Sequence, residues 1–143
     1  MFSNSSKYAL KAVLYLAVNA SESNKIMAKN ISEPINVPQA YISKLLQDLS
    51  RHDIVSSVRG PNGGFYLNEQ NLKTPLITIV NVIDGENRLN SCLLSIQNCN
   101  NDKPCPLHHF AASYRTHLLE NLENNTINDM VKGIKAKTSF LPL

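Results

Sequence analysis

The chain lacks any long run of apolar residues. No stretch of its 143 residues approaches the roughly 18 to 20 apolar side chains that a helix needs to cross a bilayer. The opening residues, MFSNSSKYAL, also lack the basic and then apolar layout of a signal peptide. These two absences predict a cytoplasmic protein.

Cysteine is scarce and charge is nearly balanced. Three cysteines are an odd number, and in a reducing compartment they do not indicate a disulfide framework. The formal net charge of +3 permits a nucleic-acid partner but is weak evidence for one. There is no nucleophile–base constellation, phosphate-binding glycine loop or pair of catalytic carboxylates, so the sequence predicts that the protein is not an enzyme.

The most informative stretch of the chain lies between residues 36 and 67. Pro38 suits the first position of a helix, because the missing N–H of proline costs nothing there. Apolar side chains then recur at helical spacing and predict a buried stripe: Ile42, Leu45, Leu46 and Leu49. The opposite face is rich in donors of the kind that reach base edges and phosphates: Gln39, Ser43, Lys44, Gln47 and Arg51.

Beyond this helix the sequence predicts a two-stranded hairpin. Residues 54–58 and 65–67 have strand character, and the turn between them is rich in glycines that tolerate positive φ: Gly60, Gly63 and Gly64. An arginine at the tip, Arg59, could enter a minor groove. An amphipathic helix and hairpin in an ordinary α+β domain, with Arg59 solvated, fit the same pattern, so both interpretations stay open.

Two helices are expected before this unit. The first covers about residues 7–20, is capped by Ser5 or Ser6, and is apolar around most of its circumference, which indicates a buried scaffold. The second covers about residues 27–33, because Pro34 disfavours continuation. Its short link to the next helix predicts a helix-turn-helix arrangement.

Further helices are expected after the hairpin. Residues 78–84 predict a short helix closed by Gly85. Residues 106–123 predict a long helix with an apolar stripe, and Thr126 begins a last one that ends near Gly133.

All three cysteines fall within fourteen positions. Cys92, Cys99 and Cys105 are followed closely by His108 and His109. Cys105 is expected near the cap of the long helix, where its pKa would be lowered, and His108 lies three residues on, over the same face. His109 points elsewhere and is the weaker ligand.

Three interpretations of this cluster compete. The thiols could be free in a mobile loop, they could hold a structural zinc ion together with His108, or the same four residues could hold an iron–sulfur cluster.

Three segments carry a family resemblance. SKYALKAVLYLA, VPQAYISKLLQDL and VSSVRGPNGGFYL resemble the Rrf-type regulators, the family of the iron–sulfur cluster regulator IscR and the nitric-oxide sensor NsrR. The resemblance covers about residues 3–132 and is most specific in the third segment, which matches the wing of the family.

The resemblance implies a mainly α fold with a small β-hairpin: a winged helix-turn-helix plus a long C-terminal dimerisation helix. Residues 1–72 would form the DNA-binding domain, 73–104 a connecting helix and cysteine loop, and 105–143 the dimerisation helix and tail. The implied function is a homodimeric transcription regulator that binds double-stranded DNA at a near-palindromic operator.

The resemblance also assigns residues. Four would face the major groove, namely Gln39, Tyr41, Ser43 and Lys44, and two the minor groove, namely Arg59 and Gly60. The cofactor would be a cluster of the 2Fe–2S type, with zinc as the lesser possibility, on Cys92, Cys99, Cys105 and His108. Such a cluster would sense iron–sulfur status, redox state or nitric oxide.

Three departures from the family pattern matter. Some cluster-sensing members carry an acidic residue where this chain has Ser43, which affects the preferred DNA sequence. The gap between the first two cysteines is one residue longer than in IscR-like members. NsrR-like members recruit an acidic ligand near the first helix, and this chain has Tyr8 there.

Two rival functions stay open. One is a DNA-binding regulator that senses through zinc or thiol oxidation. The other is a winged-helix protein-interaction adaptor that does not read DNA.

Overall fold

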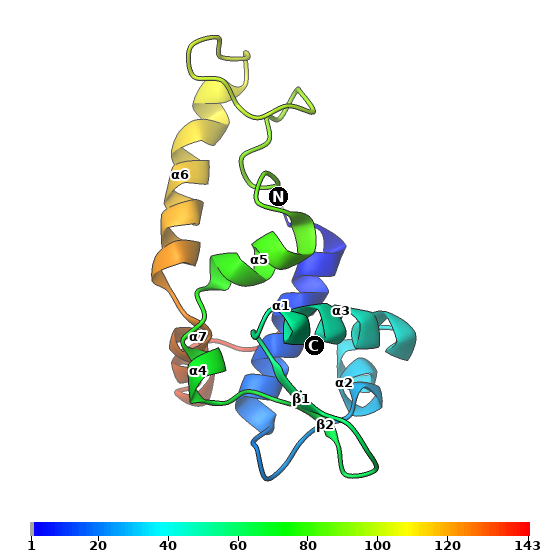
Figure 1. Cartoon of the computed structure of the whole chain (residues 1–143). Helices are drawn as coiled ribbons and strands as arrows, with labels where there is room; N and C mark the ends of the chain where they lie inside the picture. The colour runs from blue at the N-terminus through cyan, green and yellow to red at the C-terminus, as the bar shows by residue number, and fades with distance from the viewer. Residues whose placement is uncertain (1) are drawn as a thin grey trace.

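The computed structural model describes residues 2–143 and shows a mainly helical chain with one antiparallel hairpin (Figure 1). The fold class that the resemblance implied is confirmed. In chain order the elements are α1 (Asn4–Asn19), α2 (Ala28–Ile35), α3 (Gln39–Arg51), β1 (Ser56–Val58), β2 (Gly64–Tyr66), α4 (Glu69–Leu72), α5 (Leu76–Asp84), α6 (His108–Asn124) and α7 (Ile127–Lys135).

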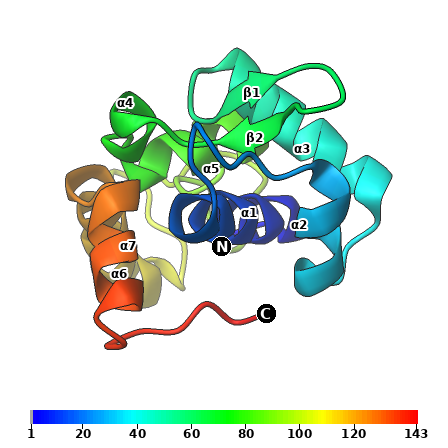
Figure 2. The ribbon, with the colours of Figure 1, turned by 90° about the horizontal axis from the view of Figure 1, so that it is seen from below.

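The helix α1 is the scaffold of the molecule. It packs against α2, α3, α5 and α7, and Figure 2 shows it lying between α7 on one side and α2 and α3 on the other. The buried side chains that make these contacts are Ala9, Ala12, Val13 and Leu16. The predicted cap was wrong: the hydroxyl of Ser3 accepts a hydrogen bond from the Ser6 amide, so the helix begins at Asn4 and both Ser5 and Ser6 lie inside it.

The helix-turn-helix unit consists of α2 and α3. The predicted end of α2 was wrong, because Pro34 lies within the helix and Asn36 ends it instead. Asn36 has a φ of 59°, the left-handed conformation that closes a helix. The predicted stripe of α3 is fully or almost fully buried, and Pro38 lies at the cap, one position before the helix.

The hairpin of β1 and β2 forms the wing. Ser57 pairs with Phe65, and Ile26 forms a further bridge to Phe65. Gly60 and Gly64 have φ values of 110° and 147°, as the turn prediction required. Gly63 is needed for another reason: a Cβ there would lie 2.1 Å from the carbonyl oxygen of Val58. The first strand is shorter than predicted, because Ile54 and Val55 are buried in the core before the ladder begins.

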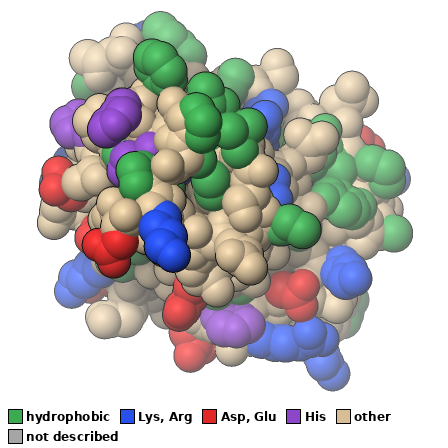
Figure 3. Space-filling view, turned by 90° about the horizontal axis from the view of Figure 1, so that it is seen from above, with side chains coloured by type: hydrophobic (Ala, Val, Ile, Leu, Met, Phe, Trp, Pro, Cys, Tyr) green, Lys and Arg blue, Asp and Glu red, His purple; other side chains and the backbone are tan. Residues whose placement is uncertain are grey.

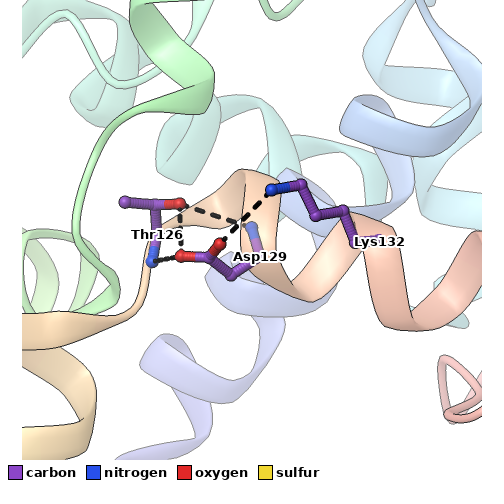
Figure 4. A network of polar contacts seen from close by, with 3 residues as sticks. All are labelled: Thr126, Asp129 and Lys132. Atoms are coloured by element: carbon purple, nitrogen blue, oxygen red, sulfur yellow. Dashed lines mark hydrogen bonds and ion pairs between the residues drawn. The ribbon is translucent and has the colours of Figure 1, made fainter.

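The helix α6 begins later than predicted, and α7 ends later than predicted. Pro106 and Leu107 form a turn in which the Cys105 carbonyl accepts a hydrogen bond from the His108 amide, so α6 starts at His108. The predicted start of α7 at Thr126 is confirmed, and a capping box of reciprocal hydrogen bonds between Thr126 and Asp129 forms it (Figure 4). The predicted end of α7 at Gly133 was wrong, since the helix runs to Lys135.

A 23-residue cysteine loop, residues 85–107, joins α5 to α6 at one end of the molecule (Figure 1). Throughout the described part of the chain, no helix has both the length and the apolar character to cross a membrane.

Candidate nucleic-acid interface and cysteine site

A groove of about 460 Å³ lies between α2, α3 and the wing. Its walls carry exposed donor side chains, contributed by Lys29, Gln39, Gln47, Arg51 and Arg59. Three glycines of the wing, Gly60, Gly63 and Gly64, also line it and bring no side chain. A concave surface with cationic and amide donors is chemically suited to phosphates and base edges.

Three of the six predicted DNA-contacting residues line this groove: Gln39, Arg59 and Gly60. Tyr41 and Lys44 line a different hollow, of about 200 Å³, between α1, α3 and the end of α5. Ser43 is half-buried on α3 and lines neither.

Sequence reasoning missed Lys29 as a groove residue. It is the second residue of α2, and its side chain is exposed toward α3 and the wing. The signal available was its place on the polar side of a short amphipathic helix, but that signal does not reveal which neighbour the side chain faces. Arg51 also lines the groove and forms an exposed ion pair with Asp48 at 2.9 Å, which stabilises the fold little.

The cysteine loop brings the four predicted metal ligands together as two pairs. The sulfur atoms of Cys92 and Cys105 are 3.5 Å apart, and the sulfur of Cys99 is 3.1 Å from Nδ1 of His108. Sequence spacing had suggested that His108 would lie over Cys105 rather than beside Cys99. His109 is exposed, and its ring and that of His108 are arranged edge to face.

Backbone contacts produce this pairing. The amide of Cys99 donates to the carbonyl of Asn90, and the amide of Cys92 donates to that of Gln97, so the loop folds back on itself. Arg115 of α6 donates a 3.1 Å hydrogen bond to the carbonyl of Ser91, which ties the folded loop to the helix. Within residues 2–143, no three His, Cys, Asp or Glu side chains converge on one point that could hold a metal ion.

The pKa values of two thiols move in opposite directions. A hydrogen bond from the Leu94 backbone, followed by one from the Cys105 side chain, lowers the pKa of Cys92. Burial, followed by the hydrogen bond with Cys92, raises the pKa of Cys105. The prediction that a helix N-terminus lowers the pKa of Cys105 was therefore wrong, since α6 begins three residues later.

The apolar side chains of this end of the molecule are unusually exposed. Leu93, Leu94 and Ile96 of the loop, with Phe110 and Tyr114 of α6, lie at the surface. Figure 3 looks onto this end and shows hydrophobic side chains gathered beside histidines. A second hollow, of about 220 Å³, runs between the loop and α6 and is lined by Leu93, Phe110 and Tyr114 among others.

Comparison with known proteins places these features in a family. Residues 2–133 match the family described as Rrf2, iron-dependent transcriptional regulator. A protein of Aquifex aeolicus named as an HTH-type transcriptional regulator is 30% identical over 142 residues, which cover 98% of this chain and 96% of that protein. The HTH-type transcriptional regulator IscR of Escherichia coli is 27% identical over 127 residues, 89% of this chain and 77% of that protein.

Solved structures show the same fold. CymR, the global cysteine regulator of B. subtilis, superposes with a TM-score of 0.72 at 22% identity, covering 92% of this chain and 96% of that one. IscR of T. potens superposes with a TM-score of 0.67 at 21% identity, covering 97% of this chain and 91% of that one. The family and these relatives are transcriptional regulators rather than enzymes. The chain belongs to the Rrf2 family of transcriptional regulators.

Proposed function

We propose that the protein is a dimeric regulator that binds a near-palindromic operator, with α3 in the major groove and the wing in the minor groove. The observation that carries this proposal is the groove between α2, α3 and the wing, where Lys29, Gln39 and Arg59 converge. Gly60 is exposed and nothing lies within 4 Å of its missing side chain, so its backbone allows the close approach that a duplex requires. The six residues assigned by resemblance, Gln39, Tyr41, Ser43, Lys44, Arg59 and Gly60, remain the residues proposed for the DNA-binding surface.

Replacing Arg59 tests the wing assignment. Arg59→Ala should weaken operator binding by about tenfold or more. It should also reduce the slope of log affinity against log salt concentration by about one. The measurement is a titration of a duplex, selected from a random library by the wild-type protein, at several salt concentrations. Lys103→Ala, an exposed loop substitution outside the groove, is the matched control. Unchanged affinity in Arg59→Ala refutes the wing assignment.

The proposed dimer forms through α6. This helix stands at the side of the molecule (Figure 1), and within the chain it packs mainly on α5. Phe110 and Tyr114 are 79% and 55% exposed on it. Burying such aromatic side chains against a second copy would remove them from water, which is the usual source of stability at a homodimer interface.

The proposed sensor is an iron–sulfur cluster on Cys92, Cys99, Cys105 and His108. The arrangement in two pairs supports it, because a 2Fe–2S centre takes two protein ligands on each iron, whereas a single zinc ion takes all four around one point. When bound, a cluster would supply a link among these side chains that oxidants and nitric oxide can break. The residues themselves would then hold the loop folded against Arg115 and α6.

Anaerobic reconstitution tests the sensor. The purified protein should take up iron and sulfide in equal amounts and show a visible absorption spectrum, and alanine at Cys92 or Cys99 should abolish both. Stoichiometric zinc, or metal-free protein with a reversible disulfide, supports a regulator that senses in another way. Absence of salt-dependent binding to any duplex supports an adaptor that does not read DNA.

A further inference from the structure

Tyr41 lies on α3 among the proposed DNA contacts, yet its side chain is engaged within the protein. Its hydroxyl is 2.5 Å from the hydroxyl of Ser5, and its ring meets the edge of Tyr8 with centroids 6.0 Å apart. Both partners belong to the first turns of α1. Tyr41 therefore connects α3 to α1, and only about a third of its surface is exposed to solvent.

The same end of α1 is bound to the base of the cysteine loop. The amide of Ser3 donates a 3.1 Å hydrogen bond to the carboxylate of Asp84, and the Ser3 hydroxyl donates a second. Asp84 is the last residue of α5, and the loop leaves the helix at Gly85, whose φ is 84°. In Figure 1 the start of α1 accordingly lies beside the end of α5.

The two contacts belong to the same end of α1, only two residues apart along the chain. Ser3 caps α1 through the Ser6 amide, and Ser6 and Ala9 are completely buried. A displacement of Asp84 would therefore move Ser5 and Tyr8 with Ser3. A hollow of about 200 Å³, lined by Tyr41, Val82 and Ile83 among others, lies beside the contact between α3 and α5.

We propose that Tyr41 is a positioning residue that sets the placement of α3 through Ser5 and Tyr8, and that the Ser3–Asp84 hydrogen bonds connect this placement to the cysteine loop. The regulatory part of the inference rests on the proposed function. The route differs from one through the dimer contact, because it runs within a single protomer and does not use α6.

Amide hydrogen exchange tests the connection without any cluster or DNA. In cluster-free full-length protein, Ser3→Ala and Asp84→Asn should raise exchange at residues 39–44 of α3 by about threefold to tenfold, the effect of losing one such hydrogen bond. Tyr41→Phe should do the same directly. Ser23→Ala is the matched control, since its exposed hydroxyl contacts only Ser21. Increases confined to the start of α1 and to residues 84–92 overturn the inference.

DNA binding separates positioning from base reading. If Tyr41 positions α3, Tyr41→Phe weakens binding by about threefold to tenfold while the bases selected from a random library stay the same. If its hydroxyl reads a base, the preference changes at one position of each half-site, which contradicts the inference.

DNA binding also tests the connection to the cysteine loop. In Ser3→Ala and Asp84→Asn, the ratio of the DNA affinity of cluster-free protein to that of cluster-loaded protein should approach one. An unchanged ratio, in variants that retain the cluster, overturns the connection while leaving the proposed function intact.

Discussion

At the scale of single residues, the capping box of α7 makes a measurable contribution to stability. The amide and hydroxyl of Thr126 each donate a 2.8 Å hydrogen bond to the Asp129 carboxylate, and these bonds lower the pKa of Asp129 (Figure 4). The helix they begin packs on α1 and buries Ile127 and Val131. Because α1 packs against most of the other helices, weakening its contact with α7 should lower the free energy of unfolding of the whole protein.

Thr126→Ala should lower the free energy of unfolding by about 1 kcal/mol, the usual cost of losing a threonine cap. Urea denaturation measures the change. Thr116→Ala is the control, because Thr116 bonds only the carbonyl of Ala112 within the exposed face of α6. Equal stability of the two variants contradicts the assignment of the cap.

Asp84 should make stability depend on pH. Burial raises the pKa of its carboxyl, but the hydrogen bonds from Ser3 and Ser6 and the charge of Arg88 together hold the pKa below the ordinary value of 3.8. A lowered pKa in the folded state means that the stabilisation is complete above the ordinary value. It is lost as the pH falls through the lower folded value.

The comparison that isolates this effect is wild type against Asp84→Asn. Wild type should melt at the higher temperature at neutral pH, and the difference should shrink between about pH 5 and about pH 3. Thermal unfolding at stepped pH measures it. A difference that stays constant through this range shows that the charge of Asp84 is not involved.

At the scale of elements, the exposed apolar face of α6 predicts that two copies of the chain pair through this helix. Phe110→Glu should convert a dimer to a monomer in light scattering, because a carboxylate cannot be buried unpaired in an apolar contact. The monomer should stay folded, since Phe110 is 79% exposed in the single chain. Phe140→Glu is the control on an equally exposed phenylalanine in the tail. A monomeric wild type, or a dimeric Phe110→Glu, contradicts the role of α6.

Elements with a strong local pattern could be predicted, and contacts between them could not. The buried stripe of α3 follows from the helical spacing of its apolar residues. The turn of the wing follows from its glycines, because glycine tolerates the positive φ that the turn has. The start of α6 was misplaced because Pro106 fits a turn as well as a first helical position. The partner of His108 was misplaced because it depends on the Cys99–Asn90 backbone bond, which joins residues nine apart and leaves no periodic signal.

The same limit applies to the nucleic-acid groove. Donors on α3 were visible from the sequence, but the face each one takes depends on what packs against the helix. Gln39 faces the wing, whereas Tyr41 turns to α1 because Ser5 and Tyr8 receive it. No property of residues 36–67 alone indicates that contact.

At the scale of the whole molecule, α1 connects the parts that the proposed function requires. It packs against α3, α5 and α7, and its first turn touches both the base of the cysteine loop and the start of α3. A change in the loop can therefore reach the proposed DNA surface by a short path of hydrogen bonds and packed side chains. Allostery of this kind requires that the two states of the loop favour different placements of α3.

The most direct test is the affinity of one selected duplex for cluster-loaded and for cluster-free protein, measured anaerobically over a range of salt. The account predicts salt-dependent binding in at least one form and affinities that differ by about fivefold or more. Equal affinities of the two forms, or no binding that responds to salt, would contradict it.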